Sequence, residues 1–366
     1  MVENQLRMGD TYQENSGIQK SATVTVVRSG ILADRIARYI EENQEEFHSG
    51  SSFRVAEYGC ADGSNSVDIL EQIIQTVRKH DEDKKIEIMC NDLPTSNFSK
   101  LFNLLNPLRE KYGNIYLSVS GCSFYNQVAP SESFDLVYSF TSVQWMSSAP
   151  CPLSKRWYIA GQEDLDQKSR EIWSEYAIQE WTKFLSQREK ELKKGGILYV
   201  STICFQDPPT EGNKLMTQAY NIFAQKHMQV LKEYGVSEDY PLNLPAAFRS
   251  KDEFLQPFST SNLKLKLEEF NRYRTEVPVV LKLARDGERA KLQKMLEDID
   301  RAFSQPFYSS QLQKIPTLTE ERREELLEKL YSVMFADLPS DYDYAKGFGS
   351  FYFGGMMISK NGNAVQ

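Results

Sequence analysis

Apolar and polar residues alternate along the first half of the chain with two different periods. Helix-like patterns cover residues 31–47, 65–77, 97–112 and 168–192. Short apolar runs predict strands over residues 53–58, 86–90, 115–119, 134–140 and 197–205. Strands separated by helices of this length predict an α/β fold, a parallel sheet with helices on both faces.

The second half of the chain is mostly helical in pattern. Helices are predicted near residues 215–234 and over much of 277–335, and strands over 263–270 and 348–359. The simplest arrangement is a seven-stranded sheet whose last two strands frame helical insertions over its carboxyl edge, where open α/β sheets bind ligands. We therefore expect a core at 31–205, a mostly helical cap at 206–340 that includes a core strand near 263–270, and a final core strand and tail at 341–366.

The composition excludes several classes of protein. The 366 residues include 43 Lys and Arg against 51 Asp and Glu, a formal net charge of −8, which disfavours nucleic-acid binding. No apolar run is long enough to span a membrane, and the polar N-terminus lacks a signal-peptide core. Five cysteines at irregular spacing support neither a disulfide framework nor a zinc motif. We expect a cytoplasmic protein without a membrane or nucleic-acid partner.

The histidines restrict the chemistry further. Of the three, His48 and His80 fall at polar ends of predicted helices, where a solvated surface role is the usual one. An enzyme with this sequence should therefore not depend on a histidine base.

The loops after the first two strands have the residues of a nucleoside site. Residues 57–65 read EYGCADGSN, in which glycines allow close approach of the backbone to a ligand. This G-x-x-x-G with a preceding acid suits S-adenosylmethionine better than a nicotinamide, although a generic tight turn remains an alternative. Asp92, after the second strand, can accept both ribose hydroxyls, and Leu93 can pack on the adenine. The alternative is that Asp92 caps the next helix.

Two further loops add candidates. Ser123 and Phe124 follow the third strand and could hold the edge and face of an adenine, or Phe124 could simply close the core. The segment around Thr141, Gln144 and Trp145 follows the fourth strand and suits a pocket for a small carboxylate or a planar acceptor. An isolated Trp is as often a core residue.

In this order the segments resemble the SABATH family of S-adenosylmethionine-dependent carboxyl methyltransferases, which also has N-methylating members. The segment MGDTYQENSGIQ (8–19) resembles the family's M-x-G…S-Y-x-x-N-S-x-x-Q, and NDLPTSNF (91–98) resembles N-D-L-P-x-N-D-F. GCSFY (121–125) is similar to G-S-F-Y, residues 138–146 to a block ending S-Y-S-L-x-W-L, and NLP (243–245) to F-N-x-P. The resemblance runs from Met8 to about Glu253. It implies a class I methyltransferase fold, a seven-stranded Rossmann-like sheet with an α-helical cap, and a homodimer.

The resemblance also implies roles for residues of this chain. Residues 1–30 would form a lid over the site. The cofactor S-adenosylmethionine would contact a set of residues on the lid and the first three loops: Tyr12, Ser16, Glu57, Gly59, Cys60, Asn65, Asp92, Leu93, Ser123 and Phe124. Gln19 and Trp145 would donate to the two oxygens of a substrate carboxylate. Phe140, Thr141 and Gln144 would line the acyl pocket.

This chain departs from the family pattern at several of these positions. Glu57 stands where the family has Asp, Thr141 where it has Tyr, and Gln144 where it has Met or His, so the pocket should be roomier and more polar. Ser154 and residues 240–243 (YPLN) stand where some members hold a structural magnesium, so we predict no metal.

The predicted reaction is direct transfer of the sulfonium methyl to a carboxylate oxygen of a small-molecule acid. A carboxylate is ionised at neutral pH and needs no general base, so catalysis would come from orientation and desolvation. The alternatives are N-methylation of a small planar heterocycle and a catalytically silent ligand-binding protein. A nucleic-acid amino-methyltransferase is disfavoured because DPPT (207–210) follows the fifth strand and not the fourth.

Overall fold

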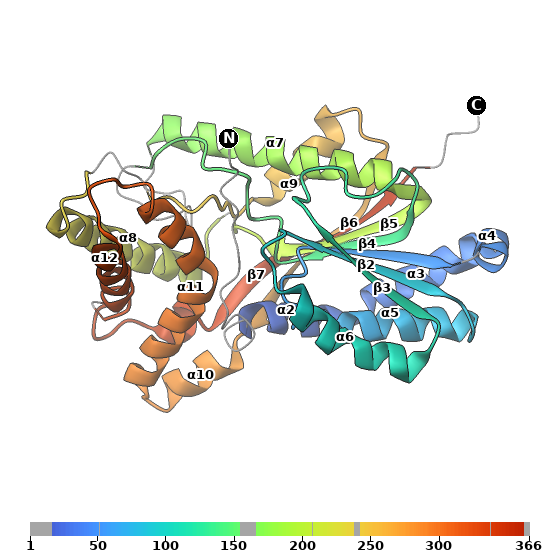
Figure 1. The fold of residues 1–366 in the computed structure, drawn as a ribbon, viewed down its shortest axis with the longest axis horizontal. Helices are drawn as coiled ribbons and strands as arrows, with labels where there is room; N and C mark the ends of the chain where they lie inside the picture. The colour runs from blue at the N-terminus through green and yellow to red at the C-terminus, as the bar shows by residue number, and fades with distance from the viewer. Residues whose placement is uncertain are drawn as a thin grey trace.

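A seven-stranded mixed sheet forms the centre of the fold, with strand order β3-β2-β1-β4-β5-β7-β6 (Figure 1). The computed structural model describes residues 17–50, 52–153, 166–206, 208–237, 242–336 and 338–361. The strands are β1 (Phe53–Tyr58), β2 (Ile86–Asp92), β3 (Ile115–Gly121), β4 (Phe134–Phe140), β5 (Leu192–Ile203), β6 (Leu265–Glu276) and β7 (Ser350–Lys360). The first five strands run parallel, and β7 is antiparallel to both of its neighbours. Parallel strands bring the ends of β1 to β4 to one edge.

Helices cover both faces of the sheet, as the alternating pattern predicts (Figure 1). On one face lie helices whose apolar residues join the first sheet core: α2 (Gly17–Ser29), α3 (Ile31–Glu42), α5 (Val67–His80) and α6 (Phe98–Tyr112). The other face is covered by α7 (Gln167–Glu191) and α9 (Lys251–Thr260), whose residues join the second sheet core. A short helix, α4 (Gln44–Ser49), follows α3.

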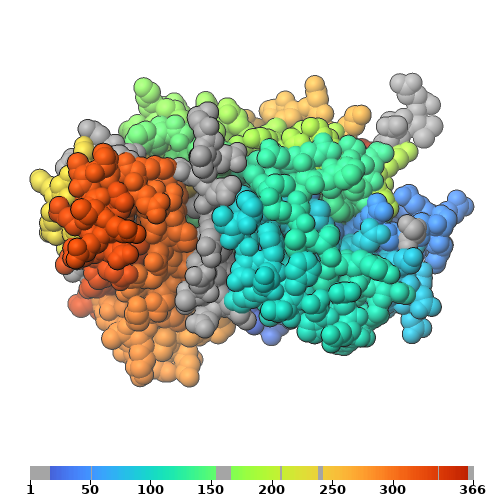
Figure 2. Space-filling model, in the orientation of Figure 1, coloured from blue at the N-terminus to red at the C-terminus, as the bar shows by residue number. Residues whose placement is uncertain are grey.

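A helical cap packs around a hydrophobic core of its own, and Figures 1 and 2 show it as a separate lobe beside the sheet. Its helices are α8 (Glu211–Glu233), α10 (Pro278–Arg285), α11 (Arg289–Leu312), α12 (Glu320–Ser332) and α13 (Tyr344–Gly347). Strand β7 belongs to both lobes, because Phe353 is buried in the cap core while Met356 and Met357 are buried in the two sheet cores.

Several predicted element bounds change in the structure. Strands β1 and β4 match their predicted residues, whereas the helix predicted over 31–47 is divided at Asn43, whose side chain donates to the carbonyl of Tyr39 (2.8 Å). Strand β6 continues six residues beyond Phe270, because these residues still pair with β7, although most of their side chains are polar and exposed on this edge strand. Helices α2 and α9 were not predicted, although the capping box of Ser250 and Glu253 marks the start of α9.

Candidate active site

The loop after β1 is bent tightly against the loop after β4. Gly59 and Gly63 both have φ of +80°, and Ala61 has φ of +49°, a conformation that side chains rarely adopt. A Cβ at Gly59 would collide with the side chain of Ser142, whose hydroxyl donates to the carbonyl of Gly59 (3.1 Å). Only glycine therefore fits at this position.

Asp92 connects the first loop to the second. Its Oδ2 accepts from the backbone N–H of Ala61 (2.7 Å), and its Oδ1 accepts from the N–H of Leu93 (2.7 Å) and the hydroxyl of Ser96 (2.7 Å). The helix-cap interpretation of Asp92 is wrong, because Asn97 caps α6 by accepting from the N–H of Lys100 (3.0 Å). Burial raises the pKa of Asp92. A carboxylate held in this way at the strand end has the placement that a ribose acceptor needs.

Glu57 lies at the bottom of this pair of loops and is 5% exposed. Its Oε1 accepts from the hydroxyl of Ser66 (2.8 Å), and burial raises its pKa to about 7. Cys60, the next predicted contact along the loop, is also buried. In the same loop, Oδ1 of Asn65 is buried without a hydrogen-bond partner among the described residues. A buried acceptor of this kind fits a hydrogen-bond donor of a polar ligand.

A buried ion pair on α7, which the sequence did not indicate, supports the loop after β3. Arg188, fully buried on α7, pairs with Glu191 (2.7 Å) and donates to the carbonyl of Phe124 (2.7 Å). Ser123 lies in the same loop and accepts from the N–H of Tyr125 (3.3 Å). The ring of Phe124 packs edge-on against Phe184 (5.7 Å between centroids) and stays partly exposed.

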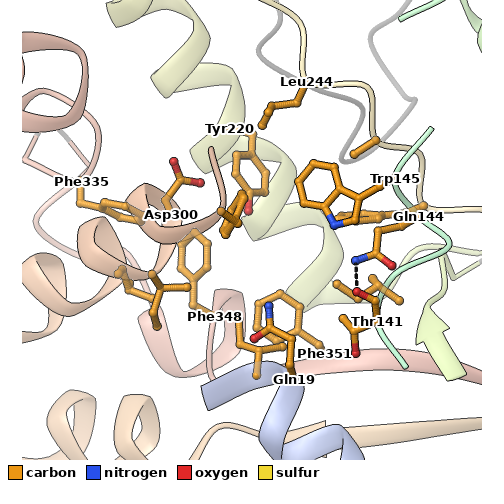
Figure 3. Close-up of a pocket in the computed structure, with 17 residues that line it drawn as sticks. Gln19, Thr141, Gln144, Trp145, Tyr220, Leu244, Asp300, Phe335, Phe348 and Phe351 are labelled. Atoms are coloured by element: carbon orange, nitrogen blue, oxygen red, sulfur yellow. Dashed lines mark hydrogen bonds between the residues drawn. The ribbon is translucent and has the colours of Figure 1, made fainter. Parts of the chain in front are cut away.

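A pocket opens next to these loops, between the sheet edge and the cap (Figure 3). Gln19, from the first turn of α2, and Trp145, from the loop after β4, both line it. Oε1 of Gln19 is buried and has no partner among the described residues. The wall is otherwise largely aromatic and aliphatic, with these further residues: Ile18, Thr141, Gln144, Ile203, Tyr220, Leu244, Ala246, Phe248, Leu296, Ile299, Asp300, Phe303, Phe335, Phe348 and Phe351.

Thr141 and Gln144 hold the post-β4 loop in shape. Thr141 has φ of +50°, a strained conformation for a β-branched residue. The amide of Gln144 donates to the carbonyl of Thr141 (2.8 Å) and accepts from the hydroxyl of Thr202 (2.8 Å), as Figure 3 shows for the first of these bonds. The polar end of Gln144 is therefore already used inside the protein, and of these two residues only the hydroxyl of Thr141 is unpaired within the described part of the chain.

The structure corrects the expectation for Phe140, which does not line this pocket. Side chains alternate along a strand, so Phe140 shares the face of Tyr138, and its ring packs 5.7 Å from both Tyr138 and Tyr199 in a sheet core.

A second buried arginine, also missed by the sequence analysis, holds the post-β4 loop against α7. Arg249 is 1% exposed and donates to the carbonyls of Val143 (2.6 Å) and Ala177 (2.9 Å). The N–H of Met146 donates to the carbonyl of Pro245 (2.7 Å). Hydrogen bonds to Val143 and from Met146 therefore hold the loop before and after Trp145.

Some predictions fall on other parts of the chain. Tyr12, Ser16, Ser154 and Tyr240 lie outside the described residues.

Within the described ranges, no cluster of three or more His, Cys, Asp or Glu side chains is placed to hold a metal ion. No helix in the same ranges has both the length and the apolar character required to cross a membrane. None of the residues lining the pocket is a histidine.

The sheet order, the glycine loop after β1 and the acid after β2 define a class I methyltransferase fold. The structure superposes on that of loganic acid methyltransferase, which was determined with SAH, with a TM-score of 0.79, 17% sequence identity and coverage of 99% of this chain and 100% of that one. The sequence matches the family of SAM dependent carboxyl methyltransferases over residues 6–337. The chain therefore belongs to this family, the SABATH methyltransferases.

Curated relatives include proteins named as methyltransferases of carboxylic acids and proteins named for caffeine synthesis. The chain is 26% identical over 234 residues to indole-3-acetate O-methyltransferase 1 of Arabidopsis thaliana, covering 56% of this chain and 58% of that protein. It is 28% identical over 203 residues to a benzoic acid/salicylic acid carboxyl methyltransferase of Petunia hybrida (50% and 56%) and 25% identical over 221 residues to a probable caffeine synthase of Coffea canephora (54% and 57%). The chain thus spans little more than half the length of the relatives it matches.

Proposed function

We propose that this protein transfers the methyl group of S-adenosylmethionine to the carboxylate of a small-molecule acid and releases a methyl ester. The observation that carries the proposal is the meeting of Gln19 and Trp145 on the wall of one pocket, next to the post-β4 loop, which contacts the loop after β1 through the Ser142–Gly59 hydrogen bond. Gln19 and Trp145 come from distant parts of the chain, and each offers an N–H donor suited to a carboxylate oxygen.

We propose the following division of roles, which the family resemblance implies. The loops after β1, β2 and β3 would hold the cofactor, with Asp92 accepting from the ribose, Leu93 and Phe124 against the adenine, and Glu57 near the ammonium. Thr141 would stay on the acyl side of the pocket. The substrate carboxylate would be oriented by two donors only, which keeps the nucleophile reactive while the aromatic wall excludes water.

The test is a methyl-transfer assay with radiolabelled S-adenosylmethionine and a panel of carboxylic acids, in which the product is identified by base-labile release of the label. Asp92→Ala should abolish cofactor binding measured by calorimetry. Trp145→Ala should keep cofactor binding and lose turnover. If both variants lost cofactor binding and turnover equally, the assigned roles would be contradicted. Cofactor binding by the parent protein without formation of any methyl ester would contradict the proposed reaction.

N-methylation of a planar heterocycle is the second candidate, because relatives named for caffeine synthesis are among those that the chain matches. An N-methyl product survives base treatment, so the same assay separates the two reactions.

We further propose a homodimer located in the cytoplasm, which light scattering of the purified protein and fractionation of cells can test. The division into a lid at 1–30, a core, a cap and a final strand stays part of the same proposal.

A further inference from the structure

A buried carboxyl group lies on the wall of the acyl pocket. Asp300, on α11, is 4% exposed and is one of the residues that line the pocket. The two acids just before it on the helix behave differently: Glu297 pairs with Arg301 (3.0 Å) and Asp298 pairs with Lys294 (2.8 Å) at the surface. Asp300 alone of the three faces inward, on the side of the pocket opposite Thr141, Gln144 and Trp145 (Figure 3).

The protein itself does little to neutralise this group. Its Oδ2 accepts from the hydroxyl of Ser304 (3.1 Å), which in turn lies 2.6 Å from the hydroxyl of Tyr331. The neighbouring Arg301 is already committed to Glu297 and to Glu328 (2.6 Å). Within the described part of the chain, therefore, Asp300 has one hydrogen-bond donor and no cation in direct contact.

Packing alone does not explain an acid at this position. The single proton of the Ser304 hydroxyl is shared with the backbone carbonyl of Asp300, which is the nearer acceptor (2.8 Å against 3.1 Å), so this hydroxyl does not need the carboxyl group. A buried carboxyl without a counter-ion is costly, and burial raises the pKa of Asp300 to about 7. Around it the wall is aromatic, including Phe303, Phe335 and Phe348. A costly polar group on the wall of a ligand pocket points to a polar group on the ligand.

We propose that Asp300 selects an acid that carries a hydrogen-bond donor, a hydroxyl or an amino group, at the end remote from the carboxylate that is methylated. The proposal rests on the proposed function, because it assumes that Gln19 and Trp145 take the reacting carboxylate. The donor of the substrate would then reach the Asp300 oxygen that Ser304 leaves open. Above pH 7, where Asp300 is ionised, a second carboxylate at that end of the substrate would be repelled, so dicarboxylic acids should be rejected there.

The experiment compares matched acids of equal length with and without a terminal hydroxyl or amino group, using kcat/KM for ester formation by the full-length protein. The kcat/KM of the parent protein should be about tenfold or more higher for the substituted acid, because an acid without the terminal hydroxyl or amino group leaves Asp300 unpaired. Asp300→Leu should remove this preference, so that kcat/KM for the two acids of a pair becomes equal within a few-fold. Asp300→Asn should keep the preference for the hydroxyl-substituted acid, because an amide oxygen still accepts from a hydroxyl. It should lose the preference for the amino-substituted acid, because the neutral amide no longer pairs with a cationic ammonium.

Two controls keep the inference separate from the proposed function. Asp298→Asn removes a neighbouring surface acid and should leave the preference unchanged. Calorimetric binding of the same acids in the presence of S-adenosylhomocysteine reports on Asp300 even if no acid is methylated, an outcome that would contradict only the proposed function. The proposed role of Asp300 would be overturned if Asp300→Leu lowered kcat/KM equally for both acids of each pair. It would also be overturned if the parent protein showed no preference between them.

Discussion

At the scale of single residues, the buried acids of the site determine how stability depends on pH. Glu57 has a native pKa of about 7, above its ordinary value of 4.5. A group whose pKa is raised by folding stabilises the native state below its unfolded pKa, and this contribution is lost as the pH rises through the native pKa. The loss should therefore occur between pH 4.5 and 7.

We expect Glu57→Gln to lose this pH dependence. The free energy of unfolding of the variant relative to the parent should rise by about 3 kcal/mol between pH 4.5 and pH 8, since one pKa unit corresponds to about 1.4 kcal/mol. Asp300 also has a raised pKa but is common to both proteins, so its effect cancels in the difference. Urea unfolding at four pH values measures the effect, and parallel curves would contradict it.

The proximity of Glu57 and Asp92 could be predicted from the sequence, whereas the inward position of Asp300 could not. Glu57 and Asp92 lie at the ends of the buried strands β1 and β2, and parallel strands bring their ends together, so sequence order alone predicts this proximity. Asp300 lies in a run with Glu297 and Asp298 that has the pattern of a solvated helix face. Only the packing of α11 in the cap, where it contacts α10 and α12, decides which of these acids points inward.

At the scale of elements, the buried ion pair of α7 supports the loop after β3. Glu191 accepts from Arg188, from the hydroxyl of Tyr58 (2.5 Å) and from the N–H of Val128 (2.5 Å), and both charged side chains are fully buried. Removing one partner leaves the other charge uncompensated in the interior. The end of α7 and the loop that holds Phe124 therefore depend on each other.

Arg188→Met should reduce the free energy of unfolding by about 3–5 kcal/mol. It should also weaken cofactor binding, because the carbonyl of Phe124 loses its donor. The double variant Arg188→Met, Glu191→Gln should recover part of the stability, since the uncompensated charge is gone. Chemical denaturation and cofactor titration measure both effects, and a single variant as stable as the parent would refute the supporting role.

The element bounds show where the sequence signal weakens. Strands β1 and β4 were predicted to the residue because their buried runs end abruptly at polar or glycine-containing turns. Strand β6 was predicted too short, because an edge strand keeps alternating polar residues that resemble a loop. Helix α2 was not predicted although it holds Gln19, because its pattern of small and β-branched residues is weakly helical.

At the scale of the whole molecule, the two lobes share strands and should unfold together. Phe353 of β7 is fully buried in the cap core and its ring stacks on Tyr273 of β6 (5.6 Å), while the next residues of β7 fill the sheet cores. Loss of the cap core would therefore release strand β7 from β5 and expose the sheet.

We expect differential scanning calorimetry to show one transition with equal calorimetric and van't Hoff enthalpies. Phe353→Ala should lower the midpoint of that one transition, because the lost side chain is worth about 3–5 kcal/mol. Two resolved transitions, of which Phe353→Ala shifts only one, would show that the lobes are independent.

The division of the site between two lobes also bears on how such a protein can diverge. The residues proposed to bind the cofactor lie at the ends of sheet strands, whereas Asp300 and Phe303 lie on α11 of the cap and Phe335 is buried in the cap core. Under the proposed function, a substitution on α11 alters which acid fits without disturbing those strand ends. New substrate preferences can then arise by single substitutions in the cap, while the loops of the sheet stay unchanged.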